Sequence, residues 1–140
     1  MRSPLPLAPI ALAALLLLPP GYAATPEELQ LSYQTEASGQ DPTFKPSIQR
    51  GQAFYQRTFT HSAPLPSCAS CHTDNPQQNG RHKVTGKIIK PLSPLANRDR
   101  FSDSAKVEKW FYRNCTEVVG RSCSAAEKAD FIAFLIGGDQ

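Results

Sequence analysis

Five consecutive residues, Cys68 to His72, contain three side chains that can bind a metal or form covalent bonds. Their order is C-A-S-C-H: two cysteines separated by two residues and followed directly by a histidine. The two thiols can add to the two vinyl groups on one edge of a porphyrin, and the histidine can then reach the iron from one face. The pattern predicts one covalently attached haem c, with Cys68 and Cys71 as thioethers and His72 as an axial ligand.

Two other interpretations of the motif have to be weighed. A thioredoxin-like redox pair also uses C-x-x-C, and so does half of a zinc site. The histidine directly after the second cysteine favours haem, and so does the N-terminus described next, because haem is attached to this motif outside the cytoplasm.

The first two dozen residues have the pattern of an export signal. Arg2 precedes an apolar run from Leu5 to Leu18, which is followed by Pro19-Pro20-Gly21 and the small residues Ala23-Ala24. This order is typical of a secretory signal peptide, cleaved here near Ala23 or Ala24. A retained membrane anchor is disfavoured, because the run is short for about 30 Å of hydrocarbon and contains prolines. We therefore expect residues 1–24 to be removed. Residues 25–140 would form a single periplasmic domain without stable membrane insertion.

The charge of the chain excludes one class of partner and suggests another. Net charge is +3 for the whole sequence, which is not the signature of a nucleic-acid-binding protein. Basic residues outnumber acidic ones strongly between Arg81 and Arg113, however. Such a surface could steer an acidic redox partner towards a buried cofactor. It could equally neutralise haem propionates and solvate loops.

Two further cysteines, Cys115 and Cys123, lie eight positions apart. In an oxidising compartment a disulfide is their expected state. The alternative is a four-cysteine zinc site shared with Cys68 and Cys71, but the spacing of the second pair is unusual for zinc.

Caps and helical periodicity predict four helices, at residues 25–38, 47–59 and 103–114 and from 125 until Gly137-Gly138. Thr25-Pro26-Glu27-Glu28 and Ser124-Ala125-Ala126-Glu127 have the form of capping boxes. No strand-like alternation stands out, so the expected class is all-α. Residues 73–101 form a long irregular stretch, which in a small domain tends to be functional. We expect it to wrap around the haem. Four apolar residues in this stretch could contact the porphyrin or could be ordinary core residues: Ile88, Ile89, Leu92 and Leu95.

One face of the helix predicted at residues 103–114 carries Val107, Trp110, Phe111 and Asn114 at i, i+3, i+4 and i+7. The first three residues of this face and Leu92 are the predicted haem-pocket residues. Gly51 is unusual within a helix, because it costs about 1 kcal/mol relative to alanine. A second helix crossing close by would explain it.

The order of these elements resembles class I c-type cytochromes over residues 47–137. The resemblance implies that the helix carrying Gly51 crosses the last helix at Phe131 or Phe134, and residues 25–38 would be an extra N-terminal helix. Members of that class generally bind the second iron face through methionine. The only methionine here is Met1, which lies in the predicted signal peptide.

Another residue must therefore supply the sixth iron ligand. The candidates are His61, His82, several lysines and Asn114. Spacing alone does not choose among them, since a solvated loop histidine or an asparagine at a helix end is also ordinary.

A second and more specific resemblance bears on this choice. The segment from Asp99 to Trp110, Arg113-Asn114-Cys115 and Val119 to Cys123 are similar to the oxygen-binding cytochromes c called SHP. The resemblance implies that Asn114 binds ferric iron and leaves on reduction, so that the vacant site takes O2 or NO. It also implies a disulfide between the adjacent cysteines and electron transfer from another cytochrome, a dihaem protein in that family.

Three functional hypotheses remain open on the sequence. The first is the gas-binding cytochrome just described, and the second is an ordinary electron-transfer cytochrome c with His82 or a lysine as sixth ligand. The third is a disulfide or zinc module without haem. No acid–base pair beyond the haem motif stands out, so the sequence leaves open whether the protein is an enzyme.

Overall fold

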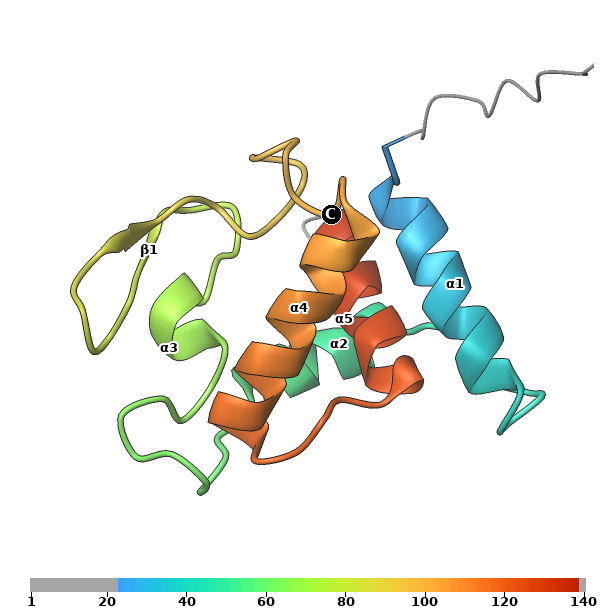
Figure 1. Cartoon of the computed structure of the whole chain (residues 1–140), viewed down its shortest axis with the longest axis horizontal. Helices are drawn as coiled ribbons and strands as arrows, with labels where there is room; N and C mark the ends of the chain where they lie inside the picture. The colour runs from blue at the N-terminus through green and yellow to red at the C-terminus, as the bar shows by residue number, and fades with distance from the viewer. Residues whose placement is uncertain (1–22, 139–140) are drawn as a thin grey trace, which may run out of the picture.

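Five α-helices, one π-helix and a two-stranded hairpin make up residues 23–138, the part of the chain that this computed structural model describes (Figure 1). None of the helices in this part is long and apolar enough to cross a membrane. Apart from Ala23 and Ala24, the predicted signal peptide lies outside the described residues. In chain order the elements are α1 (Pro26–Ser38), α2 (Ile48–Gln56), α3 (Ala69–His72), β1 (Gly80–Arg81), β2 (Ile88–Ile89), α4 (Ser104–Asn114), η1 (Cys115–Val119, the π-helix) and α5 (Ala125–Gly137).

Both predicted capping boxes are confirmed. The Thr25 side chain accepts a hydrogen bond from the backbone of Glu28, whose carboxylate accepts one from the Thr25 backbone. Ser124 and Glu127 make the same reciprocal pair at the start of α5. Such caps satisfy backbone N–H groups that have no partner within the helix, so each of these two helices begins where its sequence signal lies.

The centre of the core is α5, against which α1 and α2 both pack. Ala129, Ile132 and Leu135 of α5 are almost completely buried. The predicted inner face of α1, at Leu29, Tyr33 and Ala37, is buried as well. Tyr33 meets Phe111 of α4 edge to face, with ring centroids 5.8 Å apart, so the N-terminal helix is joined to α4 through the core.

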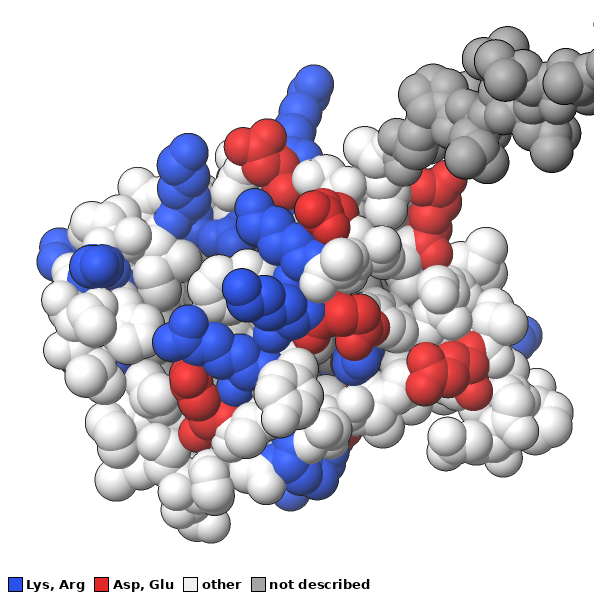
Figure 2. Space-filling view, viewed as in Figure 1, with Lys and Arg blue, Asp and Glu red and all other residues white. Residues whose placement is uncertain are grey.

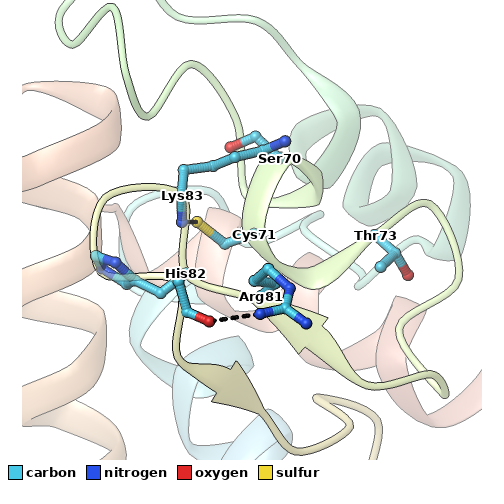
Figure 3. Close-up of a pocket in the computed structure, with 7 residues that line it drawn as sticks. Ser70, Cys71, Thr73, Arg81, His82 and Lys83 are labelled. Carbon is cyan, nitrogen blue, oxygen red and sulfur yellow. Dashed lines mark hydrogen bonds between the residues drawn. The ribbon is translucent and has the colours of Figure 1, made fainter.

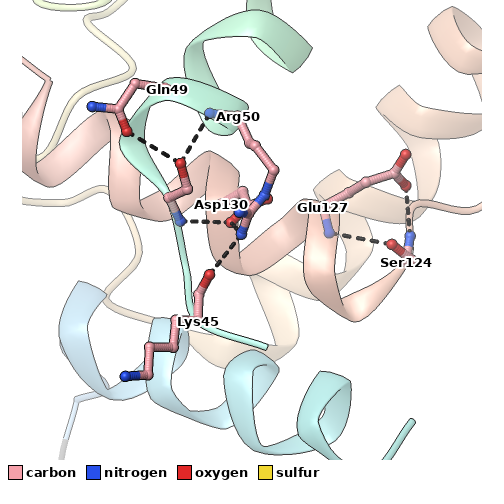
Figure 4. Close-up of polar contacts among 7 residues, drawn as sticks. Lys45, Gln49, Arg50, Ser124, Glu127 and Asp130 are labelled. Atoms are coloured by element: carbon pink, nitrogen blue, oxygen red, sulfur yellow. Dashed lines mark hydrogen bonds and ion pairs between the residues drawn. The ribbon is translucent and has the colours of Figure 1, made fainter. Parts of the chain in front are cut away.

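The close crossing predicted at Gly51 is present, between α2 and α5. A β-carbon on Gly51 would lie 2.0 Å from the carbonyl oxygen of Asp130 and 2.8 Å from Cβ of Phe134. Beside the crossing, the buried Asp130 carboxylate accepts hydrogen bonds from Arg50 Nε at 2.7 Å and from the Ser47 backbone N–H at 2.7 Å (Figure 4). The glycine lets the two backbones touch, and the ion pair fixes the position of α2 along α5.

Three local features differ from the sequence predictions. α2 ends at Gln56 instead of Phe59, because the Phe59 backbone N–H donates to the Pro66 carbonyl and folds the chain back. The irregular stretch contains the β1–β2 hairpin, whose two-residue strands are too short to show an alternating pattern. After α4 the chain continues as the π-helix η1, which is followed by Gly120 with a φ of +83°.

The expected apolar face of α4 is divided between two environments. Val107 and Phe111 are buried in the core, whereas Trp110 is 44% exposed and Asn114 is exposed. The helical spacing places all four residues on one broad face, but only its inner edge packs on α1 and α5. The outer edge carries Trp110 and Asn114.

Candidate haem site

The C-x-x-C-H motif forms the single helical turn α3. The Ser67 hydroxyl accepts a hydrogen bond from the Ser70 backbone N–H at 3.1 Å, and the His72 N–H donates to the Cys68 carbonyl at 3.1 Å. This turn brings Cys68, Cys71 and His72 together, as the predicted site requires. Burial raises the pKa of the Cys68 thiol to about 12, so it stays protonated at neutral pH.

His72 is held as a neutral imidazole. Burial, together with the smaller effect of the positive charge of Arg100, lowers its pKa to about 4. The neutral form is the one that binds a metal through a ring nitrogen. Its Nδ1 is buried and has no hydrogen-bond partner within residues 23–138. No backbone carbonyl of the loop at residues 90–95 therefore accepts a hydrogen bond from this nitrogen.

The segment after His72 has a strained backbone that the core holds in place. Thr73 has a φ of +65°, which is uncommon for a residue with a branched side chain. Its carbonyl oxygen accepts a hydrogen bond from the hydroxyl of Tyr55, a residue of α2 with no exposed surface. On the other side, a β-carbon on Gly80 would lie 2.1 Å from the Cys71 carbonyl oxygen, so β1 passes directly against α3.

A cavity of about 230 Å³ lies between α3 and the hairpin (Figure 3). His82 lines it, and the Nδ1 of His82 accepts a hydrogen bond from the Thr85 backbone N–H at 3.1 Å. The Lys83 backbone N–H faces the Cys71 sulfur at 3.5 Å. The hairpin thus brings basic side chains to the second cysteine of the motif. The lining residues are Ser70, Cys71, Thr73, Arg81, His82, Lys83 and Gly86.

Asn114 is the last residue of α4, and its side chain makes no hydrogen bond to any residue that the structure describes. One turn earlier lies Trp110, over whose ring the Arg113 guanidinium stacks at 5.6 Å. Arg113 also pairs with Glu117 of η1 at 3.0 Å, bridging the junction between the α- and π-helices. The amide of Asn114 therefore lies exposed at the junction between α4 and η1. π-Helical turns occur frequently at functional sites.

Cys115 and Cys123 are joined by a disulfide with their Cα atoms 5.7 Å apart. The bridge closes the loop that begins directly after Asn114. His61 packs against Gly120 in this loop, since a β-carbon there would lie 2.7 Å from the histidine ring. This contact places His61 beside the disulfide loop, and no pattern in the sequence predicts it.

Three of the four predicted pocket residues share one apolar cluster with Cys68 of the motif, whereas Trp110 lies outside it and is exposed. Val107 and Phe111 belong to it, and Cys68, Leu92 and Val119 pack against it. This arrangement fits a porphyrin held at one edge by α3 and covered by the loop and by α4. Ile88 and Leu95, which were also expected as apolar contacts, are 59% and 60% exposed.

Charge is distributed unevenly over the surface. Figure 2 shows most of the visible Lys and Arg over α4 and the hairpin region, with several acidic residues among them and further acidic residues on the side of α1. Between residues 25 and 44 the sequence has four acidic residues and no Lys or Arg: Glu27, Glu28, Glu36 and Asp41. The basic side is the one that carries α4 and the hairpin beside the haem motif.

The helical fold, the C-x-x-C-H turn and its neutral histidine define a c-type cytochrome. A family model described as a domain of unknown function, DUF1924, matches residues 42–135. The chain belongs to this family.

Known relatives agree with that class. The cytochrome c-type protein SHP of Cereibacter sphaeroides is 43% identical over 117 residues, which cover 83% of this chain and 88% of the relative. The structure of oxidized SHP, an oxygen-binding cytochrome c, has a TM-score of 0.75 and 40% identity, covering 81% of this chain and 97% of that one. The solution structure of Methylophilus methylotrophus cytochrome c'', described as giving insights into haem-ligand detachment, has a TM-score of 0.70. It is 42% identical and covers 80% of this chain and 92% of that one.

Proposed function

We propose that this protein is an exported, monohaem cytochrome c with an exchangeable sixth ligand. Cys68 and Cys71 would hold one haem c through thioether bonds, and His72 would bind the iron on one face. Asn114 would bind the opposite face in the ferric state and leave on reduction, opening the site to O2 or NO. When bound, the haem supplies an iron that changes oxidation state and can take a diatomic ligand.

The observation that carries this proposal is the position of Asn114. Its amide has no partner within the described residues, stands at the α4–η1 junction and precedes a disulfide-closed loop. A neutral amide oxygen is a weak, hard ligand that suits ferric iron better than ferrous iron. With Met1 as the only methionine, the mature chain has no strong thioether ligand to compete.

Two relatives favour the same chemistry. One is described as an oxygen-binding cytochrome, and the other is described in connection with haem-ligand detachment. A ligand that detaches leaves an open position, and an open position is what a diatomic gas requires. The disulfide would keep Asn114 near enough to rebind when the iron is oxidised again.

Electrons would arrive from another cytochrome in the periplasm. Exposed basic side chains lie on this side, at Lys106, Lys109 and Arg113 of α4 and in the hairpin. Such a surface attracts a partner with an acidic docking face and raises the rate of encounter at low ionic strength. A dihaem cytochrome with an acidic patch would fit this surface.

Optical spectroscopy of the purified holoprotein tests the proposal. The dithionite-reduced protein should be high-spin and should change its spectrum when CO is added. A pyridine haemochrome assay should detect one covalently bound haem per chain. A low-spin ferrous spectrum that CO leaves unaltered would refute the open site and would favour an electron-transfer cytochrome with His82 or a lysine as sixth ligand. No covalent haem would refute both.

A further inference from the structure

Arg100 lies in the long loop before α4 and is tied to an earlier part of the same loop. Its Nε donates a hydrogen bond to the Pro91 carbonyl at 2.9 Å, and one terminal nitrogen donates to the Lys90 carbonyl at 2.8 Å. The Asn97 amide also donates to Pro91, at 3.2 Å. The guanidinium is thus fixed in direction and is only partly exposed. The next residue, Phe101, is buried with a φ of +59°.

This cation has no anionic partner among residues 23–138. The ion pairs in that part of the chain involve Arg50, Arg113, Arg121 and Lys128 instead. A guanidinium has five N–H donors, and the two carbonyls use only part of them. Burial lowers the pKa of Arg100, which shows that the surroundings disfavour its charge. Partly buried charges are ordinarily paired, so the missing anion needs an explanation.

The position of Arg100 indicates what that anion is. Its charge acts on His72, so it lies within electrostatic range of the predicted iron ligand. Leu92, directly after the tethered carbonyls, packs against the same apolar cluster as Cys68. The proposed haem would bring two propionate carboxylates to this region. The fork of an arginine matches a carboxylate through two parallel hydrogen bonds.

We propose that Arg100 binds a propionate of the haem and joins it to the loop at Lys90 and Pro91. This inference rests on the proposed covalent haem, and it assigns a cofactor-binding role to a residue outside the C-x-x-C-H motif. The guanidinium would keep the propionate ionised and would hold the loop against the porphyrin. Its positive charge near the iron would favour the ferrous state and so raise the reduction potential.

Arg98 provides a matched control, because it is exposed, lies two residues away and makes no hydrogen bond or ion pair within the described part of the chain. Arg100→Gln should lower the midpoint potential of the holoprotein at neutral pH more than Arg98→Gln, which removes the same charge. Arg100→Lys should fall between wild type and Arg100→Gln. Equal potentials for Arg100→Gln and Arg98→Gln would overturn the proposal, because a guanidinium bound to a propionate has to affect the iron more than an exposed arginine of the same charge.

A measurement on the wild-type protein keeps the test independent of how well the variants fold. In the reduced, diamagnetic form prepared with CO, the side-chain N–H signals of Arg100 should show nuclear Overhauser effects to the propionate methylene protons. Their absence would overturn the proposal, including the case in which a free anion from solution occupies the site. The haemochrome assay separates the two proposals: haem attached without these contacts refutes the role of Arg100 alone.

Discussion

The hydroxyl of Tyr55 donates a hydrogen bond to the carbonyl oxygen of Thr73 at 2.5 Å, linking the buried crossing of α2 and α5 to the residue that follows His72. The Tyr55 ring lies 5.3 Å from the ring of Phe134 and 6.1 Å from that of Phe131. Packing of α5 therefore determines where the end of α3 lies. The histidine is positioned by the core as well as by its own helical turn.

Tyr55→Phe should destabilise the holoprotein by about 1–2 kcal/mol. The variant keeps the ring and its packing but leaves the partly buried Thr73 carbonyl without its donor, and an unsatisfied acceptor shielded from water costs this order of free energy. Guanidinium denaturation followed by circular dichroism measures the change. Tyr112→Phe serves as the control, because Tyr112 is 69% exposed and should show almost no change. Equal effects for the two variants would contradict the role of the Tyr55 hydroxyl.

Gly51→Ala should destabilise the protein by about 2 kcal/mol or more, although alanine gains about 1 kcal/mol in helix propensity. The new methyl group would meet the Asp130 carbonyl, a backbone atom that cannot move without shifting α5. Thermal unfolding of the holoprotein measures the loss. Gly39→Ala makes the same substitution at the end of α1, where the nearest contact is 3.2 Å, and should change the free energy of unfolding by less than about 1 kcal/mol. A neutral Gly51→Ala would mean that the helices do not cross this closely.

Those features of the fold that depend on local chemistry were predictable from the sequence. The capping boxes at Thr25 and Ser124 and the glycine under the helix crossing are signals carried by a few neighbouring residues. Each cap satisfies backbone N–H groups at the start of one helix, and the glycine permits one close contact between two backbones. Such features need only a few residues, and all three are confirmed. The haem motif belongs to the same class of signal, since five consecutive residues specify its chemistry.

Features that depend on distant partners were not predictable in the same way. The π-helix at Cys115–Val119 continues directly from α4, and no periodicity in the sequence predicts it. Trp110 and Phe111 are adjacent in sequence, yet only Phe111 packs on Tyr33 and Phe131, so burial within one helical face depended on α1 and α5. The effect of the Arg100 charge on His72 could not be inferred either, because it depends on how the loop at Lys90 and Pro91 holds the arginine in three dimensions.

Glu108→Gln should make the stability of the protein less dependent on pH in the acid range. Burial tends to raise the pKa of Glu108, but hydrogen bonds from Lys128 and Tyr33 and the charge of Lys128 lower it more, so the net pKa is below its usual value. A carboxylate with a lowered pKa stabilises the fold above its unfolded pKa of about 4.3, and this contribution is lost as the pH falls through the folded pKa. Wild type should therefore exceed Glu108→Gln in stability at neutral pH and approach it below about pH 4.

Denaturation curves at several pH values check this expectation. Glu36→Gln is the matched control, because Glu36 is exposed on α1 and makes no ion pair within residues 23–138. Its stability difference from wild type should stay nearly constant over the same pH range. A constant difference for Glu108→Gln as well would show that the Tyr33–Glu108–Lys128 contacts do not couple to protonation.

Asn114→Ala tests the sixth ligand directly. The ferric spectrum should change from low-spin, six-coordinate to five-coordinate or water-ligated, because alanine has no donor atom for the iron. Haem content should not change, since Cys68, Cys71 and His72 are untouched. His82→Ala is the control for the alternative ligand: the His82 ring already accepts a hydrogen bond from Thr85, so its removal should leave the ferric spectrum as it is. The reverse result, with His82→Ala altering the spectrum and Asn114→Ala silent, would assign the second iron face to the hairpin and not to α4.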